Sequence, residues 1–256
     1  MKFEMWSIWH ILYILSPFII FAVLYLSSRR CTEKTKSVVG YVLGSISLLI
    51  LTVRNIDIFV RSGWDVEIIP LQVCHIGNIV TGFALIFKKR WLILTAFGFN
   101  MIPAILATVF ANSLANYDTI LKIRAQAYVW GHIFIIVCAL YALLIYLPDL
   151  EKKDLYKSMG LVGGLALVAI VCNSLFRRLF DWTPNYFYLF DYKGTPLKFL
   201  YNATATSRYG WFEINWLYTG VLLAVFVGVF IGMYHLAKLI VKKVRSRQEI
   251  NAVISR

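Results

Sequence analysis

Seven long apolar segments constrain the fold of this chain more than any other feature of its sequence. A helix needs about 20 mainly apolar residues to cross the hydrocarbon core of a bilayer. Segments of about this length are separated by charged or loop-forming clusters and cover residues 7–27, 38–60, 69–87, 91–111, 127–147, 158–176 and 212–241. The sequence therefore predicts an all-α, polytopic membrane protein with seven transmembrane helices, the fourth of them kinked at Pro103.

The composition supports this fold class, because the chain is 60% hydrophobic and 15% charged. Soluble globular proteins average about 45–50% apolar and about 25% charged residues. The composition therefore excludes a soluble enzyme and a disordered binding protein. We expect one transmembrane domain over residues 1–241, an aromatic-rich extracytoplasmic loop at 177–211 and a basic cytoplasmic tail at 242–256.

The positive charges predict the orientation of the helices, since cytoplasmic loops are enriched in Lys and Arg. Of the 26 Lys and Arg residues, 16 lie in the C-terminal tail or in the loops after the first, third and fifth helices, with Lys238 at the end of the seventh helix counted in the tail. We therefore expect the N-terminus outside and the C-terminus in the cytoplasm. The net charge of +13 mostly reflects this topology, and no nucleic-acid partner is expected.

The motifs that the sequence lacks limit its chemistry. It has no GxxxxGK[ST], GxSxG, HExxH or CxxC pattern, so nothing favours a nucleotide-driven pump or an elbow-type serine hydrolase. Three of the four cysteines lie in predicted helices and Cys31 lies in a predicted cytoplasmic loop, so no disulfide is expected. Cys74 and the histidines of the candidate pocket include no pair of metal ligands with i, i+4 spacing. We therefore expect neither a metal nor another cofactor.

Polar side chains within the predicted helices are concentrated in one half of the bilayer. Such groups are costly in hydrocarbon and usually face the interior of a helix bundle. They lie near the starts of odd-numbered helices and the ends of even-numbered ones, which share one side because successive helices alternate in direction. The candidate pocket residues of this set are His10, Arg54, His75, Asn78 and Tyr128. We expect the outer half of the bundle to contain a substrate-binding pocket.

Cys74 and His132 lie at matching depth in this half, each about five residues, or about 7.5 Å, past the start of its helix. A thiol becomes a good nucleophile when a base takes its proton or a neighbouring cation stabilises the thiolate. The two residues are therefore a candidate catalytic pair. Two alternatives remain open. His75 is a competing base, although its side chain points about 100° away, and Cys74 is otherwise a small buried hydrophobe.

Arg54 is the one basic residue inside a predicted helix. Asp57 lies three residues further along the same helix, so the two charges could neutralise each other. The alternative is that Arg54 binds the phosphate or carboxylate of a lipid head group.

The loop at 177–211 contains 11 aromatic residues and follows the outer end of the sixth predicted helix. Amphipathic aromatic rings favour the head-group region of a bilayer. The loop is therefore either a lid or lipid-entry surface over the polar pocket, or an aromatic belt that anchors the fold.

Four short motifs resemble the YwaF-like integral membrane proteins of bacteria. They are Ser7-Ile8-Trp9-His10, Pro70-Leu71-Gln72-Val73-Cys74, Gly131-His132 and Asn185-Tyr186-Phe187-Tyr188-Leu189. Their order and spacing agree over most of the chain. That family is similar to a eukaryotic transmembrane acyltransferase that remodels ether phospholipids, for which a cysteine and a histidine are the proposed pair. The resemblance implies Cys74 as nucleophile and His132 as base, adds Asn185 to the pocket, and implies a bacterial plasma membrane.

These observations lead to the hypothesis of a membrane lipid acyltransferase or acyl-ester hydrolase. Cys74 would form a thioester with an acyl group taken from a membrane phospholipid or another acyl lipid, with His132 as general base and then acid. Arg54, Asn78 or His10 would orient the head group or stabilise the oxyanion. The alternative function is a transporter or a lipid-binding membrane module that uses the same pocket without chemistry. The sequence does not predict an oligomeric state.

Overall fold

The computed structural model describes residues 3–193, 195, 197–210 and 212–254. In this part of the chain, seven helical segments are long and apolar enough to cross a membrane, as the sequence predicts. The helices are α1 (Ile8–Ser28), α2 (Glu33–Ser62), α3 (Val73–Phe87), α4 (Arg90–Thr95), α5 (Met101–Val109), α6 (Ile123–Tyr146), α7 (Lys152–Phe180), α8 (Lys198–Ala203) and α9 (Trp216–Ile254). The remaining elements are the short helical turns η1 (Val66–Ile68), η2 (Ala96–Asn100), η3 (Asn112–Asn116) and η4 (Tyr186–Tyr188), and the strands β1 (Ser207–Tyr209) and β2 (Phe212–Ile214).

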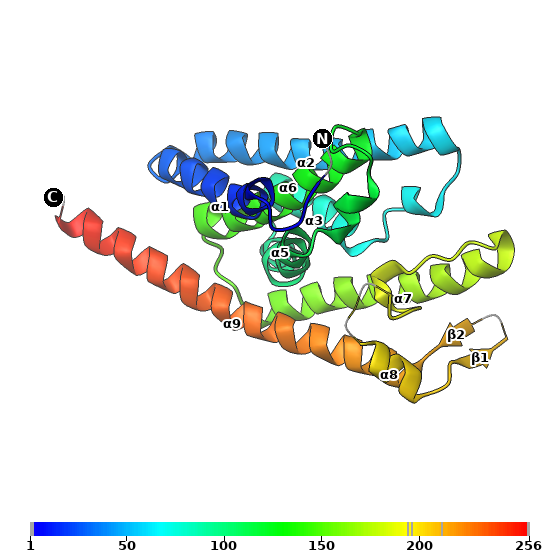
Figure 1. Cartoon of the computed structure of the whole chain (residues 1–256). Helices are drawn as coiled ribbons and strands as arrows, with labels where there is room; N and C mark the ends of the chain where they lie inside the picture. The colour runs from blue at the N-terminus through cyan, green and yellow to red at the C-terminus, as the bar shows by residue number, and fades with distance from the viewer. Residues whose placement is uncertain (1–2, 194, 196, 211, 255–256) are drawn as a thin grey trace.

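The helices α2, α3 and α6 pack against one another and form the centre of the domain. The helix α1 lies along α6, and α7 lies along α4. Figure 1 shows α9 on the opposite side of the molecule from α2, with α8 and the two strands at its N-terminal end. The α9 helix contacts η2, which connects it to the central helices.

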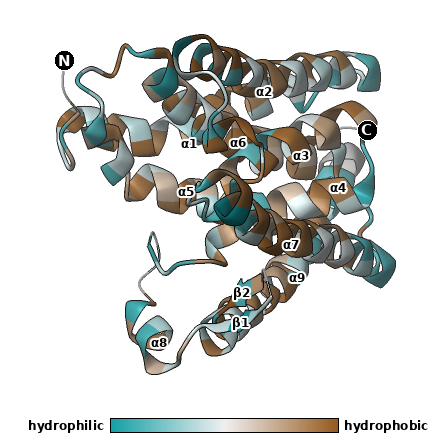
Figure 2. Ribbon diagram, turned by 90° about the vertical axis from the view of Figure 1, so that its right-hand side faces the viewer, coloured by the Kyte–Doolittle hydropathy of each residue, from teal (hydrophilic) through white to brown (hydrophobic). Residues whose placement is uncertain are grey.

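Hydrophobic residues, brown in Figure 2, follow one another along α1, α2, α7 and α9. Many of their large apolar side chains are exposed. Of the 18-residue apolar stretch that defines each span, 17–28% is buried in these four helices, compared with 61–67% in the other three spans. Val23, Leu49 and Leu167, for example, are 57–67% exposed. Large apolar surfaces are unfavourable in water, so these faces are suited to contact with lipid.

Polar residues cap the first turns of α1, α2 and α7, and α2 and α7 begin earlier than their apolar segments. Ser7 and Thr32 precede α1 and α2, and the hydroxyl of each accepts a hydrogen bond from the backbone N–H three residues later. Glu151 and Asp154 form a capping box at the start of α7. Both carboxylates also pair with Arg90 of α4, at 2.6 and 3.2 Å, and this contact joins two neighbouring spans.

The fourth span is interrupted, as its proline suggested, but the irregular turn precedes Pro103. Proline has no N–H with which to bond the carbonyl of Phe99, four residues earlier, and its ring crowds that carbonyl. The chain widens there into the π turn η2, in which the N–H of Met101 donates to the carbonyl of Ala96, five residues earlier. The span therefore consists of α4, η2 and α5.

Gly98 in η2 lets α9 pack directly against this widened backbone. A Cβ atom at position 98 would lie 2.4 Å from Cε2 of Phe230, well inside van der Waals contact. We expect Gly98→Ala to destabilise the protein by about 1–3 kcal/mol, because the aromatic ring must move out of a packed contact. Thermal unfolding in detergent measures this effect. The control is Gly163→Ala in α7, where an added Cβ meets no atom within 4 Å; equal losses of stability in the two variants would contradict the steric explanation.

The C-terminal third contains structure that hydropathy does not indicate. Residues 212–214 form β2, which pairs antiparallel with β1, so the last span begins at Trp216 and not at the predicted residue 212. The α8 helix and η4 lie within the segment that was predicted only as an aromatic loop. The α9 helix continues to Ile254, so the described part of the basic tail is helical.

Candidate functional site

Cys74 is the second residue of α3, and its sulfur lies at the positive end of that helix. The N-cap residue, Gln72, provides no side-chain acceptor for the first N–H groups of the helix. The backbone N–H groups of Cys74 and His75 interact electrostatically with the Cys74 sulfur. The sulfur is therefore at an electropositive position, and its side chain is partly buried.

Arg54 fixes the segment that leads into α3. Its guanidinium donates to the Glu67 carboxylate at 2.7 Å and to the Glu67 carbonyl at 3.0 Å. Asn55 donates to the carbonyl of Ile68 at 3.0 Å, so the end of α2 holds η1 at two consecutive residues. Arg54 is also close enough to Cys74 for an electrostatic interaction. The end of α2 therefore determines where the α3 N-terminus begins.

The predicted ion pair between Arg54 and Asp57 is not formed, so this prediction is wrong. Asp57 pairs with Arg61, one turn later, at 2.7 Å. Arg54 pairs with Glu67 instead, because its side chain lies toward η1 and not along α2; this side chain is 14% exposed. Its charge is therefore already partnered within the protein.

His132 is buried in α6, with 4% of its surface exposed. Its Nδ1 atom lies 2.6 Å from the carbonyl oxygen of Tyr128. Because a carbonyl can only accept a hydrogen bond, Nδ1 carries the proton and Nε2 is left as the basic nitrogen. The Tyr128 ring packs on the imidazole with centroids 4.3 Å apart and also interacts electrostatically with Cys74. Tyr128 thus interacts with both residues of the candidate pair.

Cys74 and His75 lie on α3 and His132 lies on α6, which packs against α3, but the thiol and the His132 ring form no hydrogen bond within the described residues. His75 interacts electrostatically with His132, and its buried Nδ1 has no hydrogen-bond partner among the described residues. The competing base therefore remains near the thiol.

Asn78 and Gly131 explain how closely these helices approach. The Asn78 amide donates to the Cys74 carbonyl at 3.0 Å and accepts from the Ser47 hydroxyl at 3.0 Å, which connects α3 with α2. A Cβ atom at Gly131 would lie 3.3 Å from Nδ2 of this amide, so glycine lets α6 approach α3 at this level. Asn78 is thereby satisfied by protein partners.

His10 and Tyr128 attach two helices to the end of α5. Nε2 of His10 donates to the Thr108 carbonyl at 2.9 Å, while Nδ1 accepts from the Trp6 backbone N–H at 2.9 Å. The Tyr128 hydroxyl donates to the Ala107 carbonyl at 2.8 Å. Both nitrogens of His10 are thus occupied, and its observed role is to anchor α1. These contacts place the start of α1, the end of α5 and the start of α6 at one end of the bundle.

The segment after α7 covers this end of the bundle. Asn173 of α7 accepts from the Tyr186 N–H at 2.8 Å and donates to the Tyr186 carbonyl at 3.1 Å. The Tyr186 hydroxyl in turn donates to the Val66 carbonyl of η1 at 2.6 Å. Burial raises the pKa of this hydroxyl, so it remains a neutral donor. Tyr188, two residues on, interacts electrostatically with Cys74.

Asn185, which the resemblance assigns to the pocket, is hydrogen-bonded within its own loop. Its amide nitrogen donates to the carbonyls of Asp191 and Lys193, and its oxygen accepts from the N–H groups of Phe190 and Asp191. These bonds close the loop that follows η4. Asn185 shapes the cover of the site, and its amide is used by the loop itself.

Glu67, Tyr186 and Tyr188 are the site residues that sequence reasoning missed. Glu67 lies in a loop outside the apolar segments, where only the buried charge of Arg54 signalled that a carboxylate was needed. The two tyrosines belong to the aromatic loop, whose abundance of rings gave no indication of which ones turn inward.

These features define a polytopic seven-helix membrane protein with a polar, partly covered cluster around a cysteine at one end of the bundle. Residues 3–234 match the model of the TMEM164 family, and the chain belongs to this family of transmembrane proteins. No curated protein and no solved structure matches the chain.

Proposed function

We propose that this protein is a membrane lipid acyltransferase or acyl-ester hydrolase that works through a thioester on Cys74. The observation that carries the proposal is the position of Cys74 in the first turn of α3, at the positive end of that helix and close enough to Arg54 for an electrostatic interaction. Reactive cysteines are found at helix N-termini and near cations. The resemblance to the YwaF-like proteins and to the ether-phospholipid acyltransferase supports the same assignment.

His132 is the proposed general base. Its Nδ1 proton is held by the Tyr128 carbonyl, so Nε2 is free to accept the thiol proton. The thiolate then attacks the ester carbonyl, the bond to the leaving alkoxide breaks, and Nε2 returns the proton to that alkoxide. In the second half-reaction an acceptor alcohol or water loses its proton to Nε2 and attacks the thioester, and the thiol is regenerated.

The position of the cluster supports an acyl lipid as the substrate. Cys74 and His132 lie within membrane spans. Other helices of the bundle expose apolar side chains that are suited to contact with the bilayer. A lipid ester can reach this depth from the membrane, whereas a charged soluble substrate would lose its hydration. We propose the plasma membrane of a bacterium as the location. Because Arg54 is already paired with Glu67, its proposed role is to position the α3 N-terminus.

The test uses a thiol-directed acyl probe on the purified full chain. We expect strong labelling of the wild-type protein and none above background in Cys74→Ala. The matched control is Cys172→Ala, which removes another partly buried cysteine from a membrane helix and should leave labelling unchanged. Labelling that survives in Cys74→Ala refutes the thioester mechanism, and lipid binding without any labelling would instead favour a transporter or lipid-binding module.

A further inference from the structure

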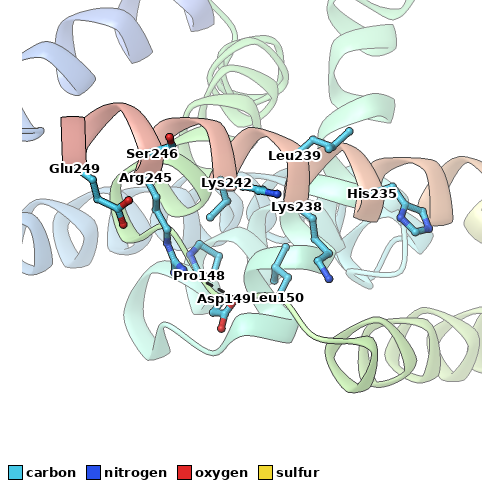
Figure 3. A pocket seen from close by; sticks show the side chains of 11 residues that line it. Pro148, Asp149, Leu150, His235, Lys238, Leu239, Lys242, Arg245, Ser246 and Glu249 are labelled. Atoms are coloured by element: carbon cyan, nitrogen blue, oxygen red, sulfur yellow. Dashed lines mark ion pairs between the residues drawn. The ribbon is translucent and has the colours of Figure 1, made fainter. Parts of the chain in front are cut away.

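A basic groove lies at the opposite end of the bundle from Cys74, between α9 and the turn that joins α6 to α7 (Figure 3). Its volume is about 700 Å³. The turn contributes Pro148, Asp149 and Leu150, and the facing side of α9 contributes alternating cationic and apolar side chains. The groove shares no residue with the cluster around Cys74.

The groove lies at the level where α9 leaves the hydrocarbon of the bilayer. From Trp216 to Ala237 the helix carries no Asp, Glu, Lys or Arg. At 1.5 Å per residue this stretch is about 33 Å long, close to the roughly 30 Å thickness of the hydrocarbon core. Lys238 is therefore the first charged residue to reach the head-group region, on the side that the charge distribution assigns to the cytoplasm.

Three cations repeat along one face of α9 in this region. Lys238, Lys242 and Arg245 are spaced i, i+4 and i+7, so all three line the groove. Nη2 of Arg245 donates to the Leu147 carbonyl at 2.5 Å, which fixes the guanidinium against the turn. The ammonium of Lys242 has no partner among the described residues, and that of Lys238 lies 5.5 Å from the ring centroid of Tyr234.

Two acidic residues also line the groove, and neither neutralises it. Asp149 is 4.0 Å from Arg245, at the limit of an ion pair, and its side chain is 79% exposed. Glu249 lies one turn beyond Arg245 and has no partner among the described residues. The three cations exceed these two anions, and Lys242 remains available to an external anion.

We propose that this groove binds the phosphate of an anionic phospholipid head group from the surrounding leaflet. The Lys242 ammonium and the fixed Arg245 guanidinium are suited to phosphate oxygens. Leu239 and Leu150 provide apolar contacts beside the cations. Inorganic phosphate offers the same anionic oxygens, but it cannot use these apolar contacts or enter from the bilayer. The groove therefore favours the lipid over the free ion. This site is independent of the proposed acyl transfer.

The test measures lipid binding to the full chain, purified in neutral detergent, by native mass spectrometry. The probes are short-chain phosphatidylglycerol, short-chain phosphatidylcholine and inorganic phosphate. We expect phosphatidylglycerol to bind most tightly. A juxtamembrane lysine contributes to anionic lipid binding by roughly fivefold, so Lys238→Ala with Lys242→Ala should weaken it about 25-fold.

The matched control is Lys243→Ala with Arg247→Ala, which removes the same charge from exposed positions of α9 outside the groove. It should change binding less than about threefold, and Lys242→Arg should retain most of it. Equal weakening in the two double variants would show diffuse attraction and overturn the proposal. Equal binding of phosphatidylcholine would overturn it as well, and so would binding of inorganic phosphate without phosphatidylglycerol.

Discussion

Replacing His132 with glutamine is expected to lower the rate of acyl transfer by a factor of about 10²–10⁴. The glutamine amide fills a similar space but does not accept a proton at neutral pH, so the thiol loses its proposed base. The buried position of His132 and its bond to the Tyr128 carbonyl indicate that no water replaces it easily. The measurement is single-turnover formation of the thioester from a short-chain lipid ester.

Two further variants make this prediction specific. Tyr128→Phe removes the hydroxyl that bonds Ala107 but keeps the backbone carbonyl that orients His132, so the rate should fall by less than about tenfold. His75→Gln tests the competing base, whose Nδ1 is unpartnered within the described residues. A large loss in His75→Gln together with wild-type rates in His132→Gln would transfer the role of base to His75.

Replacing Asn173 with alanine is expected to destabilise the protein by about 2–5 kcal/mol. The side chain is 1% exposed and satisfies both the N–H and the carbonyl of Tyr186, which is fully buried. Each buried backbone group left without a partner costs about 1–3 kcal/mol. The Tyr186 hydroxyl would also lose its alignment with Val66, and the cover over the α3 N-terminus would open.

Thermal unfolding in detergent and limited proteolysis of residues 177–211 measure these two effects. The control is Ser174→Ala, at a neighbouring buried position whose hydroxyl accepts one weak bond from Glu213 at 3.5 Å. It should cost less than about 1 kcal/mol and leave the loop resistant to protease. If Asn173→Ala behaves like Ser174→Ala, the segment is held by its aromatic contacts and not by this amide.

The number of spans could be predicted from the sequence because each membrane helix must satisfy its own backbone hydrogen bonds within one continuous apolar run. The partner of Arg54 could not, because Glu67 lies 13 residues away, in a turn that folds back onto α2. Reasoning along one helix reached only Asp57. Charge pairs between elements depend on tertiary structure, which hydropathy does not encode.

The grouping of polar residues at one end could also be predicted, since alternating helix directions require it. The hydrogen-bond partner of each polar residue could not be predicted. His10 and Tyr128 bond to the carbonyls of Thr108 and Ala107, and a backbone acceptor has no signature in the residue type. Depth along the helices likewise placed Cys74 and His132 at one level without giving the rotation of α6, which determines whether they face each other.

The π turn at Ala96–Asn100 has a consequence for how this end of the bundle is assembled. A π turn holds one residue more than an α turn, so it changes the phase of everything that follows it by about 100°. The carbonyls of Ala107 and Thr108, which accept from Tyr128 and His10, follow this turn in the chain, so their direction depends on the extra residue. Deleting a single residue from the turn would straighten the fourth span and rotate both acceptors away from their donors. One inserted residue near mid-membrane thus sets the alignment of three helices around the cysteine.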